Sequence, residues 1–285
     1  MNGSPGRVAP ADTLTRALQR ITALFALLAC TGLVCAQSTP LNDTGQITCY
    51  NYTSTGTVAP ATPDPETAGF NAQDCTRGAA AADAMGKMVK IGASTTPGRD
   101  YTKIANDGSE LPASAMLGSG PTDWACTRDN LTGLIWEVKV NNPAHLRHYE
   151  HRYAWYDTNT AINGGNAGST GGTGCNAPLP GNFCNTSAFR AAVNALAGAN
   201  RLCGATGWRM PTWLELQSLV DYGAGAAPYI DATYFPNTNF SNAYWTGDNY
   251  APNASRAWVV YFNSGHIIGS NKGLSHAVRL VRGGQ

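Results

Sequence analysis

Residues 207–222, GWRMPTWLELQSLVDY, contain the clearest structural signal in the chain. Thr212 and Glu215 have the spacing of a capping box, in which the hydroxyl accepts from the first-turn backbone and the carboxylate reaches back. The pattern predicts a helix that starts at Thr212 and is terminated by Gly223. Its buried face would consist of Leu216, Leu219 and Val220. The stretch therefore predicts a helix packed on a hydrophobic core.

Further elements are predicted on both sides of this helix. Residues 186–202 are expected to form a second helix, capped by Asn185 or Thr186, with Phe189, Val193 and Leu196 on one face. A short helix is expected over 79–89. Strands are expected over 134–139, 244–246, 257–262 and 278–282, with a turn at 263–265 and a return strand starting at 266–268. The order of elements predicts an α+β domain over 122–285, with two helices and a looped antiparallel sheet, after a loop-rich region over 37–121.

The composition excludes several classes of protein. The chain of 285 residues has a formal net charge of +1, 13% charged residues, 43% hydrophobic residues and 32 Gly. A nearly neutral chain lacks the basic surface of a nucleic-acid-binding protein, and its hydrophobic content is too high for a disordered one. Few charges and many glycines suit a globular domain with many turns and short strands.

The first 36 residues have the features of a signal peptide. Three arginines precede an apolar run over 21–34, which ends in Val34-Cys35-Ala36, with small residues where a signal peptidase cleaves. The run of about 14 residues is shorter than the roughly 20 that a membrane span needs. We therefore expect an exported protein without a transmembrane span. The alternative is a lipoprotein attached through Cys30, because Leu27-Leu28-Ala29-Cys30 resembles a bacterial lipobox.

Cleavage after residue 36 leaves six cysteines and changes the formal charge to −1, because three Arg and one Asp are lost. An even number of cysteines in an exported chain indicates disulfides. Order and proximity favour Cys49–Cys75 and Cys175–Cys184, and elimination leaves Cys126–Cys203. No C-x-x-C pair occurs in the sequence, so a zinc knuckle is not expected.

Three histidines, His145, His148 and His151, lie close together beside Glu150. Neutral imidazoles are metal ligands, but a zinc site needs three or four ligands in a suitable geometry. Pro143 and the polar surroundings favour a loop, so we expect a solvated loop there and no metal site. The sequence has no Gly-x-Ser-x-Gly elbow, so nucleophilic catalysis is not indicated.

The best candidate for a binding surface is the stretch 245–276. It combines Tyr and Trp, which give rigid contact area, with Asn, Ser and Gly, which give adaptable hydrogen bonds, as antibody paratopes do. The candidate contact residues are Trp245, Asp248, Asn249, Tyr250, Asn253, Arg256, Tyr261, Asn263, His266, Ser270, Asn271, Lys272, Ser275 and His276.

Several motifs together resemble the Lcl C-terminal domain family over roughly residues 122–285. They are DNLTGLIWE at 129–137, GWRMPT at 207–212, ELQSLVDY at 215–222, YWT at 244–246, WVVYF at 258–262 and VRLVR at 278–282. The resemblance implies a C-type lectin-like fold, related to that of the formylglycine-generating enzymes. It also implies a bacterial exported or surface protein. Several relatives bind carbohydrate or other surface ligands, so the resemblance implies ligand binding as well.

The same motifs contain residues that we expect to be structural. Trp136, Trp208 and Trp258 are large enough to fill the core, and Arg209 is expected to bridge buried carbonyls or a carboxylate such as Glu215. Many relatives have a cysteine in the closing strand, where this chain has Leu280. That departure leaves Cys203 to pair elsewhere and supports Cys126–Cys203.

Calcium is the one cofactor that the resemblance to lectins suggests. Asp248, Asn249 and Asn253 have the oxygen atoms that calcium prefers. The lectin triplet Glu-Pro-Asn is, however, replaced by Ala251-Pro252-Asn253. We expect a polar turn there, with calcium left open.

The leading functional hypothesis is a non-enzymatic module that binds a glycan or a surface protein in the periplasm, at the outer-membrane surface or outside the cell. Stretch 245–276 also resembles the variable region of target proteins diversified by bacterial retroelements. One alternative is an enzyme of the formylglycine-generating-enzyme superfamily, although no cysteine follows Cys203 to supply that enzyme's late cysteine pair. Another is a structural envelope or pilus-associated subunit in which 37–121 mediates assembly.

Overall fold

A computed structural model of the protein describes residues 41–52, 58–61, 73–175 and 179–283. The predicted signal peptide, 1–36, and the alternative lipid attachment at Cys30 lie outside these residues. Among the described residues, no helix is both long enough and apolar enough to cross a membrane.

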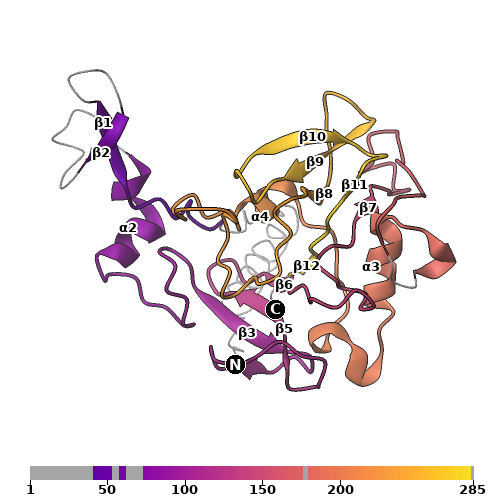
Figure 1. Ribbon diagram of the computed structural model, residues 1–285, viewed down its shortest axis with the longest axis horizontal. Helices are drawn as coiled ribbons and strands as arrows, with labels where there is room; N and C mark the ends of the chain where they lie inside the picture. The colour runs from indigo at the N-terminus through magenta and orange to yellow at the C-terminus, as the bar shows by residue number, and fades with distance from the viewer. Residues whose placement is uncertain (1–40, 53–57, 62–72, 176–178, 284–285) are drawn as a thin grey trace, which may run out of the picture. The chain divides into compact units, whose positions relative to one another are not determined.

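The central sheet is antiparallel and has the strand order β12-β6-β5-β3-β4 (Figure 1). Its strands are β3 (Tyr101–Ala105), β4 (Glu110–Leu111), β5 (Trp124–Asp129), β6 (Ile135–Glu137) and β12 (Val281–Arg282). β3 and β4 come from the region predicted to be loop-rich, and they extend the sheet that β5 and β6 begin. The final strand, β12, pairs with β6, so the end of the domain returns to its centre.

A second antiparallel sheet has the order β10-β9-β8 and contains six of the fourteen candidate contact residues. Its strands are β8 (Tyr244–Asn249), β9 (Arg256–Val260) and β10 (Ile267–Asn271). Two short pairs complete the strands: β7 (Tyr153–Ala154) with β11 (Ser275–His276), and β1 (Cys49–Tyr52) with β2 (Val58–Ala61). The predicted strands in this half of the chain are therefore confirmed, with shifted ends.

Three α-helices lie within the described residues: α2 (Gly78–Ala84), α3 (Thr186–Asn194) and α4 (Trp213–Gln217). The 3-10 turns are η1 (Asp74–Thr76), η2 (Pro180–Asn182), η3 (Gly198–Asn200) and η4 (Leu202–Gly204). Both predicted caps are present, since Asn185 accepts from the Ala188 amide and Thr212 and Glu215 form the capping box.

All three α-helices are shorter than predicted. In the two that belong to the predicted domain, a side chain hydrogen-bonds backbone groups that follow the helix. After α3, the Asn194 side chain bonds both the amide and the carbonyl of Trp208, at 2.9 and 2.8 Å, which fixes a turn there. After α4, the buried guanidinium of Arg99 takes the carbonyls of Ser218 and Val220. These hydrogen bonds fix the course of the chain beyond each helix.

Two hydrophobic clusters form the core. One contains Trp155, Trp208, Trp245 and Phe189, and α3 packs against it. The other contains Trp136, Phe235, Tyr244 and Phe262, together with Leu216, Leu219 and Val220 of the capped segment. The predicted core positions Trp136 and Trp208 are confirmed. Trp258 is not a core residue, since it is only half-buried.

All three predicted disulfides are present. The Cα atoms are 5.3 Å apart in Cys49–Cys75, 6.3 Å in Cys126–Cys203 and 5.8 Å in Cys175–Cys184. All three distances lie in the usual range for disulfides. The Cys126–Cys203 bond joins β5 to η4 and is buried in the first core cluster.

The disulfide loops differ in length, and this leads to a prediction about stability. The sequence separation is 77 residues for Cys126–Cys203 and 9 for Cys175–Cys184. By chain entropy, the longer loop is worth about 4.5 kcal/mol and the shorter about 2.6 kcal/mol. Replacing both cysteines of the longer loop by alanine should therefore lower the free energy of unfolding by about 2 kcal/mol more than the same change at Cys175 and Cys184. Urea denaturation measures both; equal losses would contradict the prediction.

Candidate functional site

The predicted contact residues of stretch 245–276 divide into a buried and an exposed group. Trp245 is 0% exposed, and its ring lies in the first core cluster, with Nε1 donating to the Tyr153 carbonyl at 2.7 Å. Its assignment as a contact residue was wrong. Trp245 pairs with Val259, and both side chains belong to the first core cluster. Because side chains alternate along a strand, the residues next to Trp245 in β8 point to the other face of the sheet.

Lys272 is also structural rather than a contact residue. It is 2% exposed, and its ammonium donates to the carbonyls of Asn163 and Asn166, at 2.8 and 2.6 Å, above the ring of Trp155. Burial lowers its pKa to about 8. The side chain thereby fixes the glycine-rich loop after residue 157 to the C-terminal half of the domain.

Ser270, Ser275 and His276 are similarly engaged within the protein. Ser270 is buried, and its Oγ is hydrogen-bonded to His276 Nε2 at 2.8 Å. The His276 ring packs edge-on against Trp245, with ring centres 4.7 Å apart, and burial lowers its pKa to about 4. The Ser275 hydroxyl accepts from the Thr173 amide at 2.9 Å. Of the predicted residues in this part of the chain, Asn271 remains exposed.

Three half-buried aromatic side chains form a continuous row, which we call the aromatic shelf: Trp213, Trp258 and Tyr250. The ring centres are 6.2 Å apart for Trp213 and Trp258, and 4.7 Å apart for Trp258 and Tyr250. Trp213 is the first residue of α4, which packs on β8 and β9. Sequence reasoning missed Trp213, because a tryptophan in the first turn of an amphipathic helix carries no signal that separates core from surface.

The shelf is held in place from below and from the side. A Cβ atom at Gly269 would lie 2.6 Å from the Tyr250 ring, so only glycine lets that ring rest on β10. Asp248 accepts a hydrogen bond from the Trp213 amide at 2.6 Å and so fixes the first turn of α4. Desolvation raises the pKa of this carboxyl.

Exposed polar residues surround the shelf. Arg256 is exposed and donates to the Gly269 carbonyl at 3.3 Å, which keeps its guanidinium near Trp258, the strand partner of Gly269. The other predicted contact residues on the surface are Asn253, Asn263 and His266, with Asn249 and Tyr261 half-buried. The predicted bridge from Arg209 to Glu215 is confirmed, with two hydrogen bonds of 2.7 and 2.6 Å.

The proposed calcium ligands are partly used by the fold. Asp248 already accepts the Trp213 amide, and the Asn253 side-chain oxygen accepts from Ser255. Over the residues that the structure describes, no three His, Cys, Asp or Glu side chains gather as metal ligands. Calcium binding by Asp248, Asn249 and Asn253 stays a prediction.

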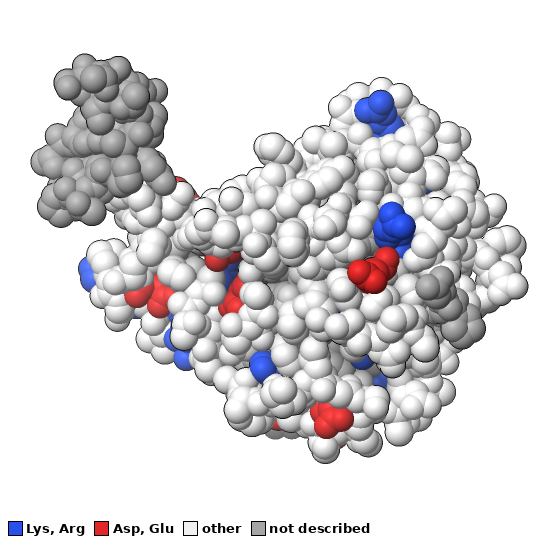
Figure 2. All heavy atoms as spheres, in the orientation of Figure 1, with Lys and Arg blue, Asp and Glu red and all other residues white. Residues whose placement is uncertain are grey.

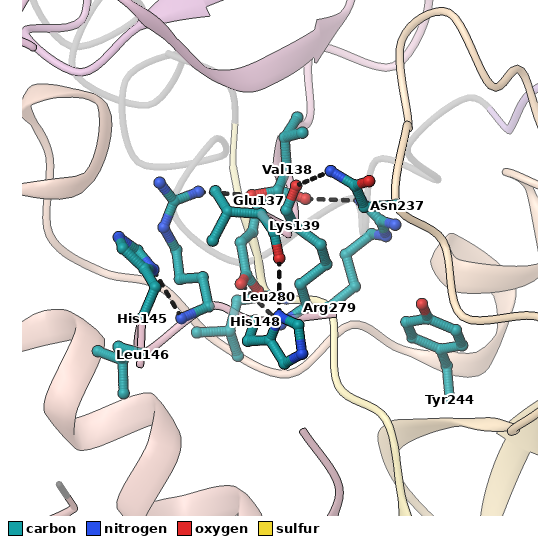
Figure 3. Close-up of polar contacts among 12 residues, drawn as sticks. Glu137, Val138, Lys139, His145, Leu146, His148, Asn237, Tyr244, Arg279 and Leu280 are labelled. Carbon is teal, nitrogen blue, oxygen red and sulfur yellow. Dashed lines mark hydrogen bonds and ion pairs between the residues drawn. The ribbon is translucent and has the colours of Figure 1, made fainter. Parts of the chain in front are cut away.

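A group of charged side chains, Glu137, Lys139, Arg147 and Arg279, is buried in the structure (Figure 3). The Glu137 carboxylate accepts from Lys139 Nζ at 2.7 Å and from the Leu280 amide at 2.9 Å, and its carbonyl accepts from Arg279 at 2.8 Å. Arg147 donates to the carbonyls of Val138 and Ala125. Burial lowers the pKa of Lys139 to about 8 despite the Glu137 carboxylate.

The histidine cluster belongs to this buried region, so the expectation of a solvated loop was wrong. His148 and His151 are buried, and their ring nitrogens face the carbonyls of Val140 and Pro143 at 3.2 Å. His145 Nδ1 accepts from the Arg147 amide at 3.0 Å. These rings hold the loop between β6 and β7 by bonding its own backbone, a role that the sequence pattern did not reveal.

Comparison with known families gives one match. The model of the Lcl C-terminal domain family matches residues 125–282, more than half of the chain. No curated protein matches the chain.

The different positions of two tryptophans lead to a test of the site. Trp245→Ala should lower the free energy of unfolding by about 3–5 kcal/mol, because it empties a buried site. Trp258→Ala should cost less than about 2 kcal/mol, because the side chain keeps part of its surface in water. Denaturant unfolding of both variants measures the difference. A loss at Trp258 as large as that at Trp245 would mean that the shelf is part of the core.

The buried histidines predict that acid weakens the fold. His145 and His276 have pKa values lowered to about 4 in the folded protein, below the ordinary value near 6.5. The unfolded chain therefore binds more protons between those two values, and stability falls as the pH falls through this window. The melting temperature should be lower at pH 5 than at pH 7. In His276→Gln the drop should be smaller by about 2–4 °C. An unchanged drop would contradict the assignment of His276.

Proposed function

The chain belongs to the Lcl C-terminal domain family, and on this premise we propose that it is an exported bacterial ligand-binding module with a C-type lectin-like fold. The module acts at the cell envelope or surface and binds a glycan or a protein. The disulfides support export, because such bonds form and persist in oxidising compartments. The two helices of the matched region and its antiparallel sheets are compatible with the proposed fold.

The aromatic shelf is the observation that carries this proposal. Its rings are half-buried, so each packs against the protein and keeps part of its surface exposed to solvent. Aromatic side chains placed this way supply much of the binding energy of known interfaces at little cost in conformational entropy. Exposed Arg256 and Asn253 can add hydrogen bonds around the rim. Few charges lie on the face of the molecule shown in Figure 2, so contact area and hydrogen bonds, rather than charge, hold the ligand.

The structure restricts which positions a retroelement could vary. Trp245, Ser270 and Lys272 make interior contacts, so changes there would damage the fold. Asn253, Asn263 and Asn271 are exposed, so changes there should cost the fold less. In our proposal, any diversification is confined to these exposed positions and to the polar rim of the shelf.

A binding experiment tests this function. The full chain, produced by export, is applied to a glycan array and to immobilised collagen, fibronectin and laminin. The strongest hit is then measured with Trp258→Ala and Tyr250→Ala. Each variant should bind at least tenfold more weakly, because a central aromatic contact contributes more than about 1.4 kcal/mol.

Ile268→Ala is the matched control. Ile268 is an exposed apolar residue of β10 that pairs with Val259, on the opposite face of the sheet from Trp258. It should bind as the unmodified protein does. If the shelf variants also keep full affinity, the shelf is not the site.

A further inference from the structure

The surface has a hollow, which we call the polar cleft, whose lining residues differ from those of the aromatic shelf. It has a volume of about 540 Å³ and is formed by segment 149–152 on one side and segment 238–242 on the other. This volume falls in the range of about 300–1,000 Å³ that small-ligand sites occupy. No residue of the shelf lines it.

Both walls of the polar cleft are fixed by buried groups. On one side, Tyr149 Oη donates to Glu150 at 3.2 Å, and buried His148 faces the same carboxylate at 3.4 Å. On the other side, Thr238 Oγ1 accepts from buried Arg279 at 2.9 Å, and the Asn239 amide donates to Tyr244 Oη at 2.8 Å. The cleft is therefore preformed, as a binding site requires.

Two opposite charges line this cleft without pairing with each other. Glu150 has a side chain that is 61% exposed, and its carboxylate has lone pairs left after the contacts from Tyr149 and His148. Arg152 is exposed, and within the described part of the chain its guanidinium makes no hydrogen bond or ion pair. The Arg152 side chain lies against Gly174, which precedes Cys175 of the Cys175–Cys184 disulfide. A Cβ atom at position 174 would lie 3.1 Å from Arg152 Nε.

The remaining lining supplies an apolar surface and an amide group. Phe240 is 46% exposed. Removing its ring from water, by packing it against a ligand, would be favourable. Asn242 points its amide toward Asn239 at 3.3 Å and keeps further donor and acceptor capacity. A carboxylate, a guanidinium, a carboxamide and an aromatic ring thus face one hollow.

We propose that the polar cleft binds a small zwitterion of the α-amino acid type. In this arrangement Glu150 accepts from the ammonium group, Arg152 donates to the carboxylate group, and an apolar side chain of the ligand packs on Phe240. A charged hydrogen bond of this kind is about twice as strong as a neutral one. Because the cleft contributes one charge of each sign, it selects a ligand that carries both. This site does not depend on the proposed function of the shelf.

Isothermal titration of the full chain with L-phenylalanine and L-leucine tests the proposal. Both should bind. N-acetyl-phenylalanine, which lacks the ammonium charge, and phenylalaninamide, which lacks the carboxylate, should each bind at least tenfold more weakly. Glu150→Gln should remove the preference for the free ammonium group, and Arg152→Gln the preference for the free carboxylate. Phe240→Ala should weaken both amino acids at least fivefold.

Matched controls keep the result independent of folding. Arg201→Gln and Phe183→Ala change exposed residues of the same types outside the cleft and should leave binding unchanged. Melting temperatures of all variants should agree with the unmodified protein. Absence of binding by both amino acids, or binding of either blocked ligand as tightly as L-phenylalanine, would overturn the proposal. Binding that is lost in Trp258→Ala but kept in Glu150→Gln and Arg152→Gln would place the ligand on the shelf and overturn it too.

Discussion

The buried carboxylate of Glu137 is the interaction on which the rest of this structure depends. It is 0% exposed and bonds Lys139 and the backbone before β12, while its own carbonyl holds Arg279. Removing one partner of such a group leaves an uncompensated charge in the interior, at a cost of about 3–5 kcal/mol. Three buried cations, Lys139, Arg147 and Arg279, accompany this one carboxylate. The guanidinium groups of Arg147 and Arg279 donate to backbone carbonyls. The centre of the domain is thus a polar frame between two apolar clusters.

This frame also fixes groups at the surface. Arg279 holds Thr238, His148 contacts Glu150, and Tyr244 receives the Asn239 amide, so groups in the interior set the positions of groups at the polar cleft. The aromatic shelf is fixed differently, by a capped helix and a glycine in β10. The two surfaces therefore rest on separate supports and can change independently of each other.

Local patterns such as helix caps were predictable from the sequence, but which face of a strand is buried was not. The capping box follows from the spacing of Thr212 and Glu215, and the disulfides follow from the order of the cysteines and elimination; the structure confirms both. Trp245 is buried and Trp258 is half-exposed, because the strand register places them on opposite faces of the second sheet. Lys272 and His148 were misplaced because a polar side chain can be buried wherever backbone carbonyls receive it. Such partners lie more than a hundred residues away in the case of Lys272 and cannot be found by periodicity.

The segment 275–282 also determines when the domain can become native. It pairs with β7 and β6, and its contacts with Glu137 span 142 and 143 residues. Until this segment has been synthesised, Glu137 and the edge of the central sheet lack their partners. Contacts of such high sequence separation make folding slow. The nascent chain therefore lacks these contacts through most of its synthesis, which would suit passage through a narrow translocation channel.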